Sequence, residues 1–215
     1  IFKHTDAQKE AIQTICNALD KKQFSPILLH GITGSGKTEI YLKSIEHAIK
    51  HGLGALILVP EIALTTQLKA RVEASFGHSV AVYHSGLTER ERRDAWQRII
   101  DGRATIGLGA RNAIFLPIQN LSLIVVDEEH DGAYKHDATP YFNARDLAIV
   151  RAKYGQAVVI LGSATPSLQS YVHAQEGRYT YISLPQRATS QSLPTVTMID
   201  MSQTPKTGSG IISVP

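Results

Sequence analysis

The sequence predicts an α/β fold in which a mainly parallel sheet is covered by helices on both faces. Short apolar runs alternate with helically spaced apolar residues along most of the 215-residue chain. The apolar runs are continuous instead of alternating with polar residues, which is typical of parallel strands buried on both faces. Apolar residues make up 43% of the chain, enough to form a sizeable core.

Helical spacing and apolar runs define the elements of the first half of the chain. Gly52 stands just past the second predicted helix, where glycine commonly ends a helix. In order, the predicted elements are a helix over 6–19, a strand over 26–30, a helix over 38–50, a strand over 55–60, a helix over 65–76 and a strand over 79–84.

The second half continues the alternation. Thr88 and Glu91 form a capping-box pattern that opens a helix carrying Trp96, Ile99 and Ile100. Beyond it, the sequence predicts strands over 104–109, 121–127 and 157–163, a helix over 143–154, an edge strand over 179–184, a linker over 186–194 and a short strand outside the sheet over 195–200.

Charge and cysteine content restrict the class of protein only loosely. The net charge of +3 is compatible with nucleic acid but is weak support for it. The single cysteine, Cys16, forms neither an internal disulfide nor a multi-thiolate zinc site, which fits a reducing cytoplasm. No leader and no apolar run near 18 residues is recognisable, so we expect a cytoplasmic protein without a membrane partner. The two ends suggest a fragment of a longer protein.

The segment "GITGSGKT", residues 31–38, matches a phosphate-binding loop and lies between a predicted strand and a predicted helix. Its glycines allow the backbone to turn with positive φ and approach phosphate oxygens, with the helix N-terminus behind them. Lys37 then supplies charge for the β- and γ-phosphates of ATP, and Thr38 supplies a hydroxyl for Mg²⁺. The predicted ATP-binding residues of the loop are Gly31, Gly34, Ser35, Gly36, Lys37 and Thr38.

Three consecutive acids and a histidine, "DEEH", begin at Asp127, the last residue of the predicted strand 121–127. Ligands of such sheets bind beyond the carboxyl ends of the strands, so Asp127 is placed to hold Mg²⁺. Glu128 is placed to orient or deprotonate the water that attacks the γ-phosphate, and His130 to face that phosphate. With Lys37, these three are the predicted catalytic residues. The alternative is a solvated acidic loop.

Two further segments carry candidate residues. In "LGSATPS", residues 161–167, the hydroxyls of Ser163 and Thr165 are placed to couple the acids to a moving element, although the segment also fits a helix start with Pro166 near its first position. The loop after the acids contains Tyr134, Tyr141 and other rings that follow neither a helical nor a strand period. The alternative for these rings is a small satellite core.

With "GITGSGKT", "DEEH" and "GSATPS" in this order, the chain resembles superfamily 2 helicases and, more closely, the bacterial replication-restart helicases. The blocks "LVPEIALTTQL", "HSGLTERER", "IVVDEEHDGAYK" and "ARDLAIVRAK" strengthen the resemblance. It implies that residues 1–185 form the first of two RecA-like lobes of an ATP-dependent 3′-to-5′ DNA helicase, and that 186–215 begin the connection to the second lobe. Zinc-binding cysteines and catalytic arginines are expected only in that second lobe.

The resemblance also assigns roles and partners. Gln8 would contact adenine, although Thr5 and Gln8 equally form a capping-box pattern. The partners implied are single-stranded and forked DNA, other primosome proteins and single-strand-binding protein, in the cytoplasm near the nucleoid. The residues expected to contact the DNA backbone are Pro60, Thr65, His84, Ser85 and Arg111, and those of the base-stacking loop are Tyr134, Lys135, Tyr141 and Phe142.

The chain departs from the family pattern at two places. Ala110 and Asn112 flank Arg111 where the family often has threonine and serine, and Phe142–Asn143 replaces a commoner Tyr–His. Two alternative functions remain: a nucleotide-gated scaffold that recruits replication proteins without unwinding, and an RNA-directed or chromatin-type translocase. We expect the isolated chain to bind nucleotide weakly and to hydrolyse almost none, because one wall of the site is missing.

Overall fold

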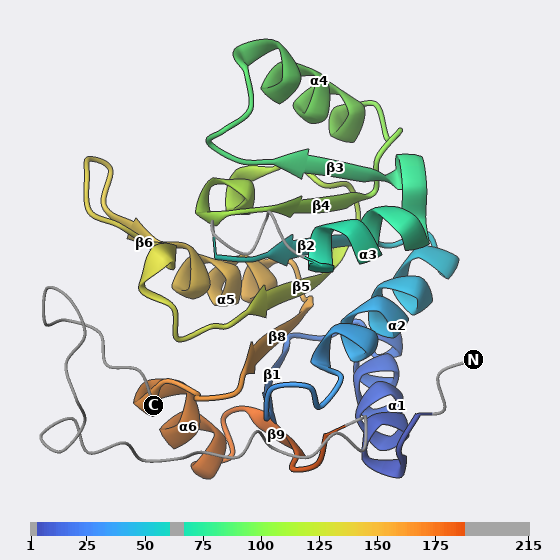
Figure 1. Cartoon of the computed structure of the whole chain (residues 1–215), viewed down its shortest axis with the longest axis vertical. Helices are drawn as coiled ribbons and strands as arrows, with labels where there is room; N and C mark the ends of the chain where they lie inside the picture. Colours follow the sequence, from blue (N-terminus) through green and yellow to red (C-terminus); the bar gives the residue numbers. More distant parts are fainter. Residues whose placement is uncertain (1–3, 61–66, 188–215) are drawn as a thin grey trace, which may run out of the picture.

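A seven-stranded parallel sheet organises the protein (Figure 1), whose computed structural model describes residues 4–60 and 67–187. Every pairing in this sheet is parallel, as predicted. The strand order is β3 (Val80–Tyr83), β4 (Ile106–Gly109), β2 (Gly54–Leu58), β5 (Leu121–Asp127), β8 (Val158–Ser163), β1 (Ser25–Gly31) and β9 (Thr180–Leu184).

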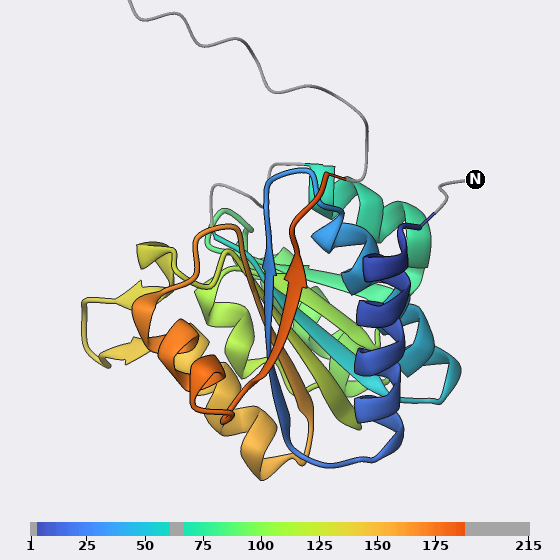
Figure 2. The ribbon, with the colours of Figure 1, turned by 90° about the horizontal axis from the view of Figure 1, so that it is seen from below.

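Helices cover both faces of the sheet. Figure 2 shows α1 on one side of strands β1 and β9 and the helices α5 and α6 on the other. One face packs against α1 (Asp6–Asp20), α2 (Lys37–Lys50) and α3 (Gln67–Phe76), and the other against α4 (Glu89–Ile100), α5 (Ala144–Tyr154) and α6 (Leu168–Gln175). The predicted architecture is therefore confirmed.

Alternation within each strand divides the core into two layers. In β1, Ile27 and Leu29 point to the α1–α3 layer and Leu28 points to the α4–α6 layer. All three are buried, and each contributes roughly 1.5–3 kcal/mol relative to an exposed position. A strand that is apolar at every position can form only where both faces are covered, which explains the continuous apolar runs of the sequence.

Local capping fixes where the helices begin. The predicted capping boxes are present at Thr5 of α1 and at Thr88 of α4. A helix start near Pro166 was the alternative considered for "LGSATPS", and α6 does follow that segment. It starts at Leu168, because the Ser167 side chain accepts a hydrogen bond from the backbone N–H of Ser170 and acts as the N-cap. Pro166 therefore lies before the helix.

The loop after the acids contains structure that the sequence did not predict. Strands β6 (Lys135–His136) and β7 (Phe142–Asn143) form a two-stranded antiparallel hairpin. A strand of two residues is too short to show an alternation of apolar and polar side chains, so the hairpin was not predicted. Short 3₁₀ helices lie at η2 (Gly77–Ser79), η3 (Arg111–Phe115) and η4 (Gly132–Tyr134).

Some predictions fall outside the described residues: Thr65, the strand at 195–200 and most of the linker. The edge position predicted for 179–184 is confirmed, since β9 pairs with β1 at the end of the sheet. In the part of the chain that the structure describes, no helix has both the length and the apolar character needed to cross a membrane.

Candidate functional site

The phosphate-binding loop joins β1 to α2 in the conformation that its glycines were predicted to allow. Gly34 has φ of 80° and Gly36 has φ of 88°, and Gly36 is the N-cap of α2. The buried Lys37 ammonium donates a hydrogen bond to the Gly31 carbonyl oxygen at 2.8 Å. An ammonium held in this way keeps donors for an anion.

Two observations show that the loop fits a phosphate group. The Ser35 hydroxyl is buried, and among the described residues it has no hydrogen-bond partner. A Cβ atom at Gly31 would lie 2.5 Å from that hydroxyl, so only glycine leaves room for the loop to close. An orphaned buried hydroxyl is costly, which indicates a ligand that satisfies it.

Asp127 ends β5 at the same sheet edge as the phosphate loop. It pairs with Gly162 of β8, while His30 of β1 pairs with the next β8 residue, Ser163. A single strand therefore separates the acids from the loop. Burial raises the pKa of the Asp127 carboxyl, and the hydrogen bond from Tyr41 and the Lys37 charge oppose that rise. The structure thus places Lys37 and Asp127 near each other at the carboxyl ends of the strands.

Tyr41 is a member of the site that the sequence analysis missed. Its ring is fully buried in α2, and its hydroxyl donates to the Asp127 carboxylate at 2.9 Å. The ring fits because residue 162 is glycine: a Cβ there would lie 1.7 Å from the Tyr41 hydroxyl oxygen. The only signal was helical position, one turn after Lys37.

Glu128, His130, Ser163 and Thr165 lie together, as the proposed coupling requires. The His130 Nδ1 atom lies 2.7 Å from the Ser163 hydroxyl and 3.8 Å from a Glu128 carboxylate oxygen. The Nε2 atom lies 3.3 Å from the Thr165 hydroxyl. Glu128 has φ of 46°, a left-handed conformation that is uncommon outside glycine and concentrates at functional sites.

The third acid, Glu129, points into the core and not toward the phosphate loop. It is buried and accepts hydrogen bonds from the Ser167 backbone N–H at 2.6 Å and the Ser170 hydroxyl at 2.9 Å. Arg145 at the start of α5 forms an ion pair with it at 3.3 Å. Glu129 therefore ties the acid loop to the starts of α5 and α6. Nothing in "DEEH" distinguishes this structural acid from its neighbours.

The prediction that Tyr134 stacks on DNA bases is wrong for this structure. Its ring is only 1% exposed, in the core layer of α4–α6. Its hydroxyl contacts the carbonyl oxygens of Leu58 and Asp127, at the ends of two neighbouring strands. The physical reason is that the 3₁₀ helix turns this ring inward, where a tyrosine can satisfy its hydroxyl on backbone carbonyls.

The other rings of the loop form an accessible cluster. Phe142 stacks on His136, with ring centroids 5.0 Å apart, and contacts Phe115 edge-on at 5.3 Å. Tyr141 is 75% exposed, and Arg111 donates to the Lys135 carbonyl oxygen at 3.2 Å. The predicted residues Arg111, Lys135, Tyr141 and Phe142 thus lie close together. Phe115 and His136 are aromatic members that were not predicted.

The remaining predicted DNA-contacting residues differ in exposure. His84 is half-buried and Ser85 is exposed, just after β3 at the carboxyl edge of the sheet. Pro60 is buried, so its ring offers no surface to a DNA strand and that prediction is corrected.

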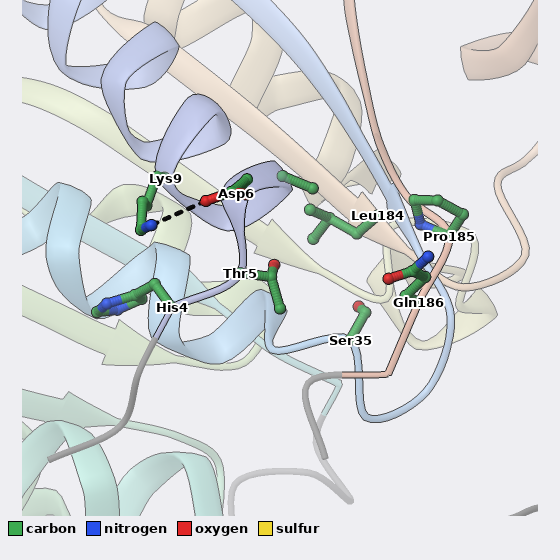
Figure 3. Close-up of a pocket in the computed structure, with 9 residues that line it drawn as sticks. His4, Thr5, Asp6, Lys9, Ser35, Leu184, Pro185 and Gln186 are labelled. Atoms are coloured by element: carbon green, nitrogen blue, oxygen red, sulfur yellow. Dashed lines mark hydrogen bonds and ion pairs between the residues drawn. The ribbon is translucent and has the colours of Figure 1, made fainter. Parts of the chain in front are cut away.

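A cleft of about 640 Å³ lies beside the phosphate loop (Figure 3). The start of α1, Ser35 and the residues after β9 line it, with Thr5 and Gln186 at its sides. Gln8 forms the capping box and also donates to the Ser35 carbonyl oxygen at 2.8 Å. The capping role considered for Gln8 is therefore confirmed. Its contact with adenine stays a prediction, since the buried side chain already uses its oxygen toward Thr5 and its nitrogen toward Ser35.

Comparison with known proteins relates this geometry to a family. Residues 1–168 match the family model described as type III restriction enzyme, res subunit. The chain is 45% identical over 95% of its length to replication restart protein PriA of Bacillus subtilis (strain 168), and 50% identical over 93% to that of Chlamydia muridarum. It covers 25% and 27% of these proteins. It thus spans about a quarter of the curated relatives it matches.

Solved structures of helicases share the fold. The structure of RecG bound to a three-way DNA junction superposes with a TM-score of 0.66 and 25% identity, over 93% of this chain and 25% of that one. A DEAD box protein from Methanococcus jannaschii gives 0.56 and 19%, over 84% of this chain and 49% of that one. The RecA-like fold and the resemblance to replication-restart helicases are thus confirmed. The chain belongs to the family of the type III restriction enzyme res subunit and is similar to replication restart protein PriA.

Proposed function

We propose that the chain is the nucleotide-binding lobe of an ATP-dependent DNA helicase that acts in replication restart. The observation that carries the proposal is the shared sheet edge: Lys37 and the acids of β5 are separated only by β8. The orphaned Ser35 hydroxyl supports a phosphate ligand in the loop. The similarity to PriA supports the biological setting.

The residues around the loop divide the work of holding ATP and Mg²⁺. Lys37 and the loop amides bind the phosphates, and Thr38 and Asp127 hold the metal ion. Bound Mg²⁺ neutralises charge that develops on the phosphoryl oxygens. Tyr41 orients the Asp127 carboxylate through its 2.9 Å hydrogen bond. Gln8 ties the start of α1 to the loop through Ser35, and a contact with the base is the role that the family resemblance assigns to it.

Glu128 removes a proton from the attacking water. Neighbouring residues transmit to the rest of the lobe whether ATP is bound or hydrolysed. His130 contacts Ser163 and Thr165 in the segment that precedes α6, so a movement of the Glu128–His130 loop reaches that segment directly. A scaffold that only binds nucleotide has no need of a second acid beside Asp127. This is why we favour a hydrolase over the recruiting scaffold.

Single-stranded DNA contacts the exposed rings and backbone-binding residues at the same sheet edge. Tyr141 stacks on bases, and Arg111, Lys135, His84 and Ser85 contact phosphates. Travel from 3′ to 5′, a preference for forks, primosome partners and a place near the nucleoid follow from the family resemblance. The arginines and zinc ligands of the second lobe would lie outside this chain.

The test uses the full-length parent protein with Glu128→Gln. Loss of a general base lowers turnover by roughly 10²–10⁴-fold. ATP binding should persist, because Lys37, Thr38 and Asp127 are unchanged. Glu176→Gln, an exposed acid at the end of α6, is the matched control and should hydrolyse ATP normally.

Two outcomes contradict the proposal. If Glu128→Gln hydrolysed ATP at the wild-type rate, Glu128 would not activate water. If the wild-type protein hydrolysed ATP but left a forked duplex intact in a strand-displacement assay, the recruiting scaffold would be correct. Comparing DNA with RNA as stimulators of hydrolysis tests the choice of nucleic acid.

A further inference from the structure

A cluster of potential metal ligands lies at the sheet edge opposite the nucleotide site. Asp20 is the last residue of α1 and precedes β1, and His51 follows α2 and precedes β2. Both therefore lie at the amino ends of strands, whereas the phosphate loop lies at the carboxyl ends. His47 is one turn before His51. The helices α1 and α2 pack against each other (Figure 1), which brings the three side chains together.

The donor atoms of Asp20, His47 and His51 all lie within 4.8 Å of one another. A separation of 2.7 Å joins the His47 Nε2 atom to an Asp20 carboxylate oxygen. Bonds of about 2.0–2.1 Å in a tetrahedral zinc site place ligand atoms about 3.3 Å apart. The His47–Asp20 separation is shorter than that value and no separation exceeds 4.8 Å, so side-chain rotations would bring three donors onto one ion.

One histidine is already oriented as a ligand. The Nδ1 atom of His51 lies 2.8 Å from the His47 carbonyl oxygen, which can only accept a hydrogen bond. The Nδ1 atom therefore carries the proton, and the Nε2 lone pair is left free. Metal-binding histidines are commonly fixed by such a bond from their second ring nitrogen. The two imidazole rings are 4.4 Å apart, and their spacing of four residues puts them on one helix face.

The donor set selects one class of cation. Two imidazole nitrogens and one carboxylate suit Zn²⁺ and neighbouring transition metals, whereas Mg²⁺ prefers oxygen ligands. The side chain of His47 is 24% exposed and that of Asp20 is 56% exposed, so an ion and its remaining water ligands can reach the cluster from solvent.

We propose that Asp20, His47 and His51 form a binding site for a zinc-type divalent transition-metal cation that links the ends of α1 and α2. The Nε2 atoms of both histidines and one Asp20 oxygen are the ligands, and His47 then carries its ring proton on Nδ1. Water fills the fourth position. The site is distinct from the Mg²⁺ site proposed with ATP. Because the folded chain alone brings the ligands together, the bound ion stabilises the folded state.

The experiment titrates ZnCl₂ into the chelator-treated 215-residue chain, free of any histidine tag, and follows heat release and thermal unfolding. We expect one bound ion per chain and a rise in Tm with zinc but not with MgCl₂. The variants His47→Ala and His51→Ala should each weaken zinc binding by about tenfold or more, because even outer-shell partners are worth that much.

Matched controls separate this site from adventitious binding. His78→Ala removes an exposed histidine outside the cluster, and Cys16→Ser removes the only thiol of the chain. Both should bind zinc as the wild type does. Circular dichroism of the unloaded variants checks that they fold, and His51→Gln provides a second, milder removal of the ligand.

Three results would overturn the proposal. One is the absence of zinc binding by the wild-type chain. Another is equal affinity in the wild type and in folded His47→Ala or His51→Gln protein. The third is a loss of binding in His78→Ala or Cys16→Ser as large as that in the ligand variants, which would place the ion elsewhere.

Discussion

Gly162→Ala tests how Asp127 is held, because it removes the space that the Tyr41 side chain occupies. The new Cβ would lie 1.7 Å from the Tyr41 hydroxyl oxygen and 2.9 Å from the adjoining ring carbon. Both distances are far below van der Waals contact. Gly162 lies inside β8 between two paired strands, so neither its backbone nor the buried ring moves freely.

The expected cost has two parts. Overpacking a filled core costs about 1–3 kcal/mol. Displacing Tyr41 also breaks its 2.9 Å hydrogen bond to Asp127, and losing a bond to a charged group costs about 1.5–3 kcal/mol. We therefore expect Gly162→Ala to lower the free energy of unfolding by about 3–5 kcal/mol, a large fraction of the 5–15 kcal/mol typical of a domain.

A double-mutant cycle in urea isolates the cause. Tyr41→Phe removes only the hydroxyl, so Gly162→Ala in that background should cost at least about 1 kcal/mol less than in the wild type. Gly132→Ala is the control, because a Cβ there meets open space; it should change stability by less than about 0.5 kcal/mol. Additive costs for residues 41 and 162 would refute the reasoning.

Further predictions concern the third acid, the exposed ring and pH. Glu129→Gln should destabilise the chain by about 1–3 kcal/mol in thermal unfolding, because its buried carboxylate loses charge-assisted bonds to Ser167 and Arg145; no change would refute the structural role. Tyr141→Ala should weaken single-stranded DNA binding by about 1–3 kcal/mol in fluorescence titration, whereas Tyr154→Ala, an exposed ring at the end of α5, should not. The Tyr41 hydrogen bond lowers the pKa of Asp127, so Tyr41→Phe should raise that pKa. As the pH falls, Mg²⁺-dependent nucleotide binding, which needs the ionised carboxylate, should then be lost at a higher pH in Tyr41→Phe than in the wild type. Loss of binding at the same pH in both proteins would contradict this.

The phosphate loop was predictable because everything it needs is local. Its glycines, Lys37 and Thr38 occupy consecutive positions, and the flanking strand and helix are readable from apolar spacing. The helix starts at Thr5 and Thr88 were predictable for the same reason, since a capping box closes within four residues. The role of the acids at the end of β5 was predictable because ligands of parallel sheets bind beyond the carboxyl ends of the strands.

Partners far apart in the chain could not be read in this way. The sequence shows three adjacent acids, but only packing sends Glu129 inward to Ser167 and Ser170 while Glu128 stays near His130. Likewise, several rings follow the acids, and the 3₁₀ helix decides that Tyr134 is buried while Tyr141 is exposed. The buried and the exposed residue of each pair are of the same type, so residue type alone does not tell them apart.

The sequence by itself determined the succession along the chain of the main-sheet strands and of helices α1 to α5, the phosphate loop and the acids that begin at the end of β5. Each of these depends on residues within a few positions of one another, where spacing and backbone preference act directly. Only the tertiary structure decided that Tyr41 and Gly162 together hold Asp127, and that Asp20 meets His47. Those contacts exist because the sheet order places distant strands and helices side by side, and no local pattern records that order.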